Sequence, residues 1–182
     1  MLKGKQICLR PLEEEDAADY AELLVRNREV WQCFEPARPE DYYTVERQRK
    51  TIAEDQEAFK SGRAYNFGIF LPDGTLIGDI SLYDVRTAFF QSASAGYSVD
   101  GIHTGRGAAT EALSLLLHFA FETLKLRRVE AGVSPENAAS IRVLEKAGFI
   151  REGLMREYLL INGRWKDHYL YAALSPQREL SG

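Results

Sequence analysis

The sequence predicts a single α/β domain with a mixed, mostly antiparallel sheet flanked by helices. Three observations favour this class. The chain has 182 residues and is 45% hydrophobic and 27% charged, the size and composition of one globular domain. Helical periodicity dominates the first third, and three strand-like runs then follow one another directly. Beyond them, helices and strands alternate. The domain is expected to span residues 1–182, with a core over about 6–174.

The first half should form a strand, two helices and a three-stranded meander. These elements are expected over residues 6–12, 13–28, 44–60, 65–71, 76–85 and 92–99. Glu13 to Asp16 are acidic and favour a helix start, where they complement the helix dipole. Residues 30–43 read as an irregular, aromatic and proline-containing segment. Pro72 to Thr75 supply turn chemistry between the first two meander strands.

The second half should begin with a long helix after Gly107, which has an apolar face from Ala109 to Phe121. A strand over residues 128–133 and a short helix ending at Gly148, in the usual C-cap place, should follow. Two last strands, over about 149–161 and 165–173, are joined by Asn162-Gly163, a strong hairpin signal.

Bulk properties exclude several classes of function. The net charge of −4 argues against sequence-independent nucleic-acid binding, which needs clustered cations. Cys8 and Cys33 are too few for a disulfide framework or a metal site. We find no apolar segment of signal-peptide or membrane-span length. We therefore expect a cytoplasmic protein with no metal, no membrane partner and no direct nucleic-acid partner. A homodimer is one option, and the sequence leaves the oligomeric state open.

A glycine-containing loop offers the first chemical signal. A strand ending at Val99 runs into Gly105 and Gly107 and then into a helix. Glycines allow close backbone approach, and free amides at a helix start favour an anion such as pyrophosphate. Alone, the motif is as often a plain turn. A dinucleotide fold would require a third glycine where Thr110 stands, and the Gly-Lys-Ser/Thr of a P-loop is absent.

A second stretch, residues 137–149, lies one helix and one strand downstream. Its helix places Asn137 and Ser140 at an exposed amino-terminal end. Taken in isolation, simple helix capping would explain both residues.

Together the two stretches, 105–112 and 137–149, resemble the pyrophosphate loop and second coenzyme A motif of the Gcn5-related N-acetyltransferase (GNAT) family. The resemblance covers essentially the whole chain. It is sharpest for the ribosomal-protein alanine N-acetyltransferase branch, through Trp31 to Pro36, Ile77-Gly78 and Arg156 to His168. It implies acetyl-CoA as the donor and a sheet splayed between the strands of 92–99 and 128–133.

The resemblance also implies the site residues. Coenzyme A would be bound by Tyr97, Ser98, Val99, Gly105, Arg106, Gly107, Ala108, Ala109, Asn137 and Ser140. The chain departs from many relatives at three positions. Ile102 replaces a Gln or Arg before the loop, Leu144 replaces a tyrosine general acid, and Gly132 falls near a glutamate base used by some relatives. Ser140 is then the polar residue left near the thioester sulfur.

The amine to be acetylated is the open question. An α-amine, with a pKa of about 8, loses its proton far more readily than a lysine. The resemblance implies the N-terminal alanine or serine of a (ribosomal) protein as the acceptor, and the chemistry of the α-amine agrees with it. The candidate catalytic residues are Ser140, Glu35 and Tyr158, with Glu157 and Asp167 as further candidate bases. The alternatives are an acetyltransferase of a small amine and a non-catalytic coenzyme A sensor.

Overall fold

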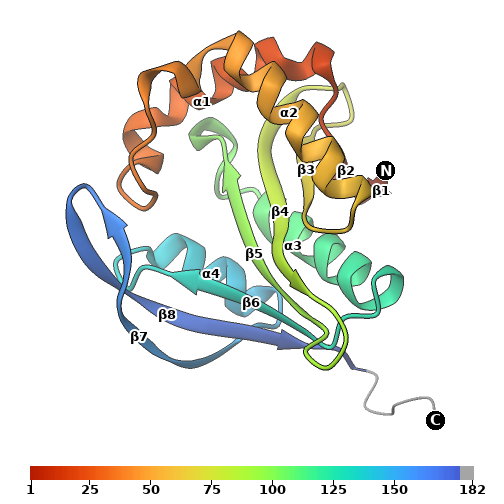
Figure 1. Ribbon diagram of the computed structural model, residues 1–182, viewed down its shortest axis with the longest axis vertical. Coiled ribbons are helices and arrows are strands. Elements are labelled where there is room, and N and C mark those ends of the chain that lie inside the picture. Colours follow the sequence, from red (N-terminus) through yellow and green to blue (C-terminus); the bar gives the residue numbers. More distant parts are fainter. Residues whose placement is uncertain (177–182) are drawn as a thin grey trace.

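A computed structural model describes residues 1–176, built around one eight-stranded sheet with the order β1-β2-β3-β4-β5-β6-β8-β7 (Figure 1). The strands are β1 (Leu2–Lys3), β2 (Cys8–Arg10), β3 (Tyr65–Phe70), β4 (Leu76–Arg86), β5 (Ser92–Val99), β6 (Arg128–Val133), β7 (Ile150–Ile161) and β8 (Arg164–Leu174). Neighbouring strands are antiparallel except β5 and β6, which are parallel. The predicted mixed, mostly antiparallel sheet is confirmed. The end of the predicted domain, residues 177–182, lies outside the described residues.

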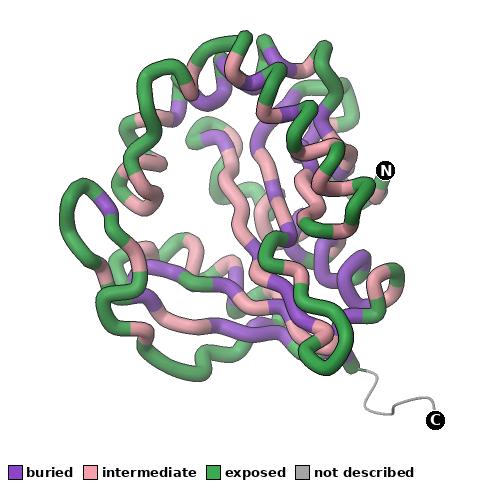
Figure 2. The backbone as a smooth tube through the Cα atoms, viewed as in Figure 1, coloured by how far each residue is buried: buried purple, intermediate pink, exposed green. Residues whose placement is uncertain are grey.

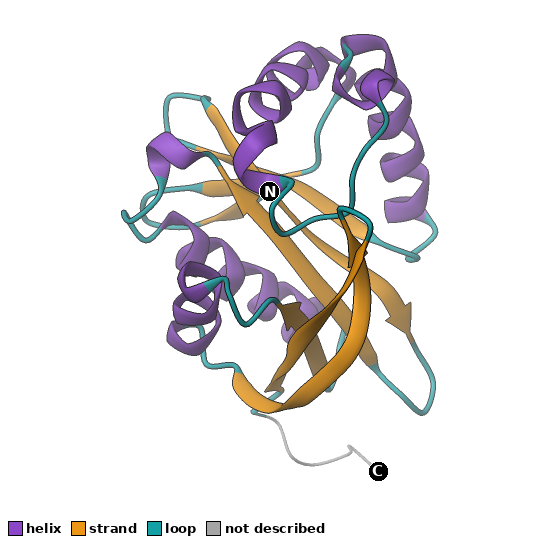
Figure 3. Cartoon of the chain, turned by 90° about the vertical axis from the view of Figure 1, so that its left-hand side faces the viewer, coloured by secondary structure: helices purple, strands orange, loops and turns teal. Residues whose placement is uncertain are grey.

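Helices cover both faces of the sheet (Figure 3). They are α1 (Ala17–Trp31), α2 (Val45–Lys60), α3 (Ala108–His118) and α4 (Ala138–Lys146), with short 3-10 or π segments η1 (Glu14–Asp16), η2 (Glu40–Tyr43), η3 (Gly101–His103) and η4 (Phe119–Thr123). Helices α1 and α2 contact each other, as do α3 and α4. Within residues 1–176, no helix combines the length and the apolarity that crossing a membrane requires.

Two apolar clusters hold these layers together. The larger contains the buried face of α3 with Ile80 and Leu82 of β4, and the smaller contains Tyr20 and Leu24 of α1 with Ile52 of α2. Figure 2 shows the buried positions following the strands and the inner sides of the helices. Because each helix buries only one stripe, its polar positions remain exposed to solvent.

The predicted elements are found with small changes at their ends. The first strand is shorter than expected, since only Cys8–Arg10 pairs with β3 before Pro11, which has no amide to donate. Its second neighbour is the two-residue strand β1, which the sequence analysis did not predict. The helix after Gly107 continues beyond His118 as the π-helical turn η4.

The sheet opens between β5 and β6. Only three residue pairs join these strands, from Ser92↔Arg128 to Ser94↔Glu130. Beyond them β5 continues to Val99, paired on its other side with β4, and β6 continues to Val133, paired with β8. The facing edges of the two strands therefore diverge, as Figure 1 shows. The predicted splay lies between the strands that the sequence indicated.

Candidate active site

A cleft of about 1000 Å³ occupies this splay. Its walls are the diverging edges of β5 and β6, the loop before α3, the first turn of α4 and the segment after α1. Of the residues predicted to bind coenzyme A, the cleft is lined by Tyr97, Ser98, Val99, Gly105, Gly107, Ala108, Ala109, Asn137 and Ser140. Residues far apart in the sequence, from Tyr20 to His168, therefore line one cleft.

The glycine loop fits a close-lying anion. Gly105 has φ of 76° and Gly107 has φ of 88°, a left-handed conformation that favours glycine. No heavy atom lies within 4 Å of where a Cβ would stand at either position. No side chain among residues 1–176 caps the start of α3 at Ala108, whereas Asn137 caps α4. The free amides at the start of α3 therefore remain available to a phosphate.

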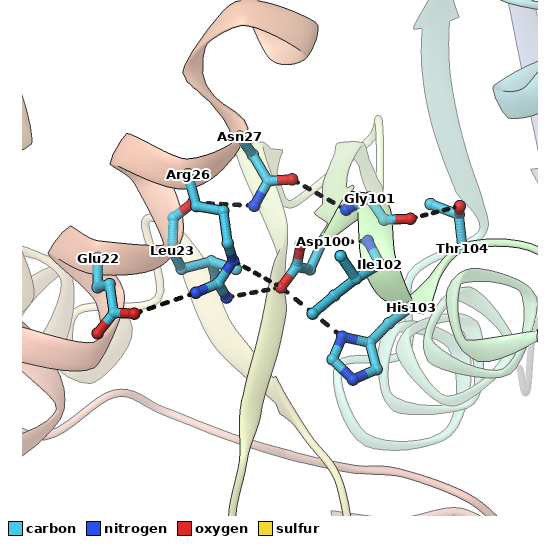
Figure 4. Close-up of polar contacts among 9 residues, drawn as sticks. All are labelled: Glu22, Leu23, Arg26, Asn27, Asp100, Gly101, Ile102, His103 and Thr104. Carbon is cyan, nitrogen blue, oxygen red and sulfur yellow. Dashed lines mark hydrogen bonds and ion pairs between the residues drawn. The ribbon is translucent and has the colours of Figure 1, made fainter.

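A polar cluster fastens this loop to α1 (Figure 4). Buried Asp100 accepts a hydrogen bond of 2.6 Å from Nη2 of Arg26 and forms an ion pair with it. Asn27 accepts one of 2.9 Å from the Gly101 amide, and its own amide nitrogen donates to the Leu23 carbonyl at 2.9 Å. Because these bonds join residues 74 apart in sequence, the position of the loop depends on α1.

The start of α4 carries a pair of hydroxyl groups. The Asn137 side chain accepts a hydrogen bond from the Ser140 amide at 3.0 Å, so the predicted capping interaction is present. The Ser140 hydroxyl lies 2.8 Å from the Tyr97 hydroxyl of β5, which also donates to the Ser140 carbonyl at 3.2 Å. Burial raises the pKa of Tyr97 to about 12. Tyr97 is therefore protonated near neutral pH and can donate.

A carboxylate lies on the other side of β5. Oε1 of Glu35 accepts a hydrogen bond of 3.0 Å from the Ser98 hydroxyl. Successive residues of a strand point to opposite faces of a sheet. The hydroxyl pair of Tyr97 and the carboxylate held by Ser98 thus lie on opposite sides of the same strand. Trp31, the last residue of α1, and Phe34 in the segment after it line the same cleft as Glu35.

Several predicted residues lie away from the cleft wall. Arg106 is exposed and does not line it. Tyr158 is 48% exposed, and its ring lies 5.4 Å from that of His168 at the rim near Gly132. The Asp167 carboxylate accepts a hydrogen bond of 2.8 Å from the Glu157 amide, within the β7–β8 hairpin.

The departures from the family pattern have structural counterparts. Leu144 is 1% exposed and belongs to the main core, so the usual tyrosine position contributes packing here. Gly132 lines the cleft without a side chain. Within the described part of the chain, no cluster of three or more His, Cys, Asp or Glu side chains is placed to hold a metal ion.

Sequence reasoning missed several residues of the cleft wall. Asp79 of β4 and Tyr20 of α1 both line it. The signal for Asp79 was the alternation in β4, where the polar residues Asp79 and Ser81 alternate with the apolar residues Ile80 and Leu82. Such alternation in an antiparallel sheet indicates that one face packs on the core and that the other is open to solvent.

The arrangement suits group transfer to a nitrogen nucleophile, since an anion-binding loop, a hydroxyl pair and a carboxylate converge on an open strand edge.

A family model described as an acetyltransferase (GNAT) domain matches residues 6–150. The chain is 48% identical over 180 residues to a probable N-acetyltransferase of Bacillus subtilis strain 168, YjcK, with 98% of this chain and 99% of the relative covered. It is 31% identical over 176 residues to the ribosomal protein uS5-alanine N-acetyltransferase of Escherichia coli K12, with 96% and 91% covered.

Among solved structures, Mycobacterium smegmatis RimJ in complex with CoA-disulfide superposes with a TM-score of 0.90 at 32% identity, covering 96% of this chain and 84% of that one. The matches extend over both stretches that carry the resemblance in the sequence. The chain therefore belongs to the GNAT acetyltransferase family and is an acyltransferase enzyme.

Proposed function

We propose that this enzyme transfers an acetyl group from acetyl-CoA to the α-amine of a protein N-terminus that begins with alanine or serine. The observation that carries the proposal is the division of the cleft by β5. On one side are the glycine loop and the Tyr97–Ser140 hydroxyl pair, and on the other is the Glu35 carboxylate held by Ser98. The first side suits an anionic thioester donor, and the second suits a cationic amine.

Acetyl-CoA supplies the activated acetyl group, and the residues of the chain bind and orient the reactants. The amides at Ala108 and Ala109 would hold the pyrophosphate beside Gly105 and Gly107. The open edge of β5 near Val99 would pair with the pantetheine arm in the manner of an added strand. Tyr97 and Ser140 would donate a proton to the departing sulfur.

Two further points support a peptide acceptor. The matched E. coli relative is named for the alanine of a ribosomal protein, and the net charge of this chain is −4. A negative protein surface attracts basic partners. A ribosomal substrate would be met in the cytoplasm. Tyr158 and Arg106, at the rim and in the exposed loop, would then contact the outer parts of the substrates.

The proposal is tested with a panel of acceptors and mass spectrometry. Peptides beginning with Ala or Ser and containing an internal lysine are incubated with enzyme and acetyl-CoA. Matched peptides with a blocked α-amine, and small amines such as spermidine, serve as controls. We expect acetylation only on the free α-amine. Acetyl groups found solely on lysine, or solely on small amines, would refute the peptide-terminus assignment and leave the family assignment intact.

A further inference from the structure

The polar face of β4 lies on the same side of the sheet as Glu35. Ile80 and Leu82 are fully buried in the main core, so Asp79 and Ser81 between and beside them point to the opposite face. Asp79 pairs directly with Ser98 of β5 in the antiparallel register. Side chains of directly opposed residues emerge about 5 Å apart. Asp79 thus lies next to the hydroxyl that holds Glu35.

Asp79 also stands where the cleft meets a second cavity. This smaller cavity, of about 330 Å³, lies between α2 and the face of β3 and β4. The two cavities share the wall residues Tyr20, Arg38, Tyr42, Asp79 and Ser81. The amine of an acceptor bound across this junction would lie between the Asp79 carboxylate and β5.

The groups around Asp79 set its charge. From α1, Asp79 is faced by Tyr20, and from α2 it is faced by Asp55. The segment after α1 contributes three more groups, namely Glu35, Arg38 and Tyr42. Burial, followed by the charges of Glu35 and Asp55, raises the pKa of Asp79 to about 7, and the Tyr20 hydrogen bond and Arg38 act in the opposite direction. Asp79 therefore exchanges a proton in the range where an α-amine, with a pKa of about 8, does so.

We propose that Asp79 is the catalytic base that takes the proton from the α-ammonium group of the acceptor, while Glu35, which lies on the same face of the sheet, also binds that ammonium. The proposal rests on the proposed function. Its geometric basis is the pairing of Asp79 with Ser98, the Ser98–Glu35 hydrogen bond of 3.0 Å and the junction of the two cavities at Asp79. Tyr20, which lines the same junction, is the positioning residue for this carboxylate.

The step balances in protons and bonds. The ammonium gives one proton to the Asp79 carboxylate and becomes a neutral amine. Its nitrogen attacks the thioester carbonyl, a C–N bond forms and the C–S bond breaks. The Tyr97–Ser140 pair gives a proton to the sulfur, so that coenzyme A leaves as a neutral thiol. The nitrogen loses its second proton to solvent as the amide forms, and a proton from solvent restores the hydroxyl pair. Asp79 finally releases its proton to solvent.

The test is the pH dependence of kcat/KM for an Ala-initiated peptide, with Asp79→Asn, Tyr20→Phe and the control Asp84→Asn. Asp84 lies on the same strand but outside both cavities. For the wild type we expect an acidic limb near pH 7. Asp79→Asn should lose about 100- to 1000-fold at pH 7, within the range of one general base, and should regain only about tenfold as the amine itself deprotonates above pH about 8.

The second variant tests the position of the carboxylate. Tyr20→Phe removes the hydroxyl that lowers the pKa of Asp79, so the acidic limb should move to higher pH while the plateau rate stays within about threefold. Asp84→Asn should match the wild type in both rate and limb. Coenzyme A affinity, measured by calorimetry, should be unchanged throughout.

The outcomes separate the two proposals. If the wild type acetylates the peptide and Asp79→Asn keeps its rate and its acidic limb, the role of Asp79 is overturned and the proposed function stands. If Asp79→Asn does not fold, an unmoved limb in Tyr20→Phe overturns the role instead. A wild type that binds coenzyme A but acetylates no peptide overturns the proposed function, and the role of Asp79 with it.

Discussion

Replacing Ser140 by alanine separates catalysis from helix capping. The variant loses the 2.8 Å contact between the Ser140 and Tyr97 hydroxyls. It keeps the Ser140 amide on the Asn137 side chain, and it keeps the Tyr97 hydroxyl on the backbone carbonyl at 3.2 Å. No buried donor is left without a partner, so the loss in unfolding free energy should be that of one hydrogen bond, about 1 kcal/mol. For a domain of this size, Tm should fall by about 2 to 4 °C.

The effect on kcat should be larger than this small loss of stability suggests. A hydroxyl that donates mainly in the transition state is expected to contribute about 10- to 100-fold, equivalent to about 1.4 to 2.7 kcal/mol. Tyr97→Phe should have a similar effect. If the two hydroxyls act as one relay, the double variant should lose little more than the worse single variant, because coupled groups are not additive.

The assay follows release of the coenzyme A thiol with a chromogenic disulfide at saturating peptide, alongside calorimetric coenzyme A affinity and thermal unfolding. Ser114→Ala is the matched control. The Ser114 hydroxyl donates to the Thr110 carbonyl at 2.8 Å on the exposed side of α3, away from the cleft. If Ser140→Ala keeps wild-type kcat and loses only Tm, Ser140 has a structural role and the reasoning about the leaving group is wrong.

Three other predictions concern separate parts of the site. Gly107→Glu should lose coenzyme A affinity, because a carboxylate would occupy the anion position, whereas Gly163→Glu, which also has φ above 70° and open space around it, should bind normally in calorimetry. Glu35→Gln should raise the acceptor KM and leave coenzyme A affinity unchanged, and a changed affinity with an unchanged KM would contradict this. Burial raises the pKa of Asp100, but hydrogen bonds from Arg26, Asn27 and the Ile102 amide, together with the charge of Arg26, outweigh it and leave that pKa lowered. Its stabilisation should therefore be full above pH about 3.9 and fade as pH falls, so calorimetric Tm losses of Asp100→Asn that are equal at pH 7 and pH 3 would refute this.

Much of the fold was determined by local sequence patterns. Asn162-Gly163 forms the tight β7–β8 turn with φ of 49° and 74°, as its chemistry requires. Thr44 and Asn137 cap the helices that follow them. Periodicity predicted the meander and α3. Apolar residues on the buried face of a helix recur every three to four positions, and those on the buried face of a strand recur every two.

Local sequence patterns predicted only part of the candidate site. Gly105, Gly107 and Asn137 carry backbone and capping signals that are local. The contact between Glu35 and Ser98 joins residues 63 apart, and that between Tyr97 and Ser140 joins residues 43 apart. Sequence periodicity predicts neither contact. The distance between the two partners of each pair is set by the splay of the sheet and by the packing of α1 and α4.

Asp79 shows the same division most clearly. The sequence by itself determined that a polar residue would stand in a buried-looking strand. Only the tertiary structure decided that Ser98 would be its cross-strand neighbour and that two cavities would meet beside it. The physical reason is that register and cavity shape come from strand pairing and layer packing, and these depend on contacts between residues far apart in the chain.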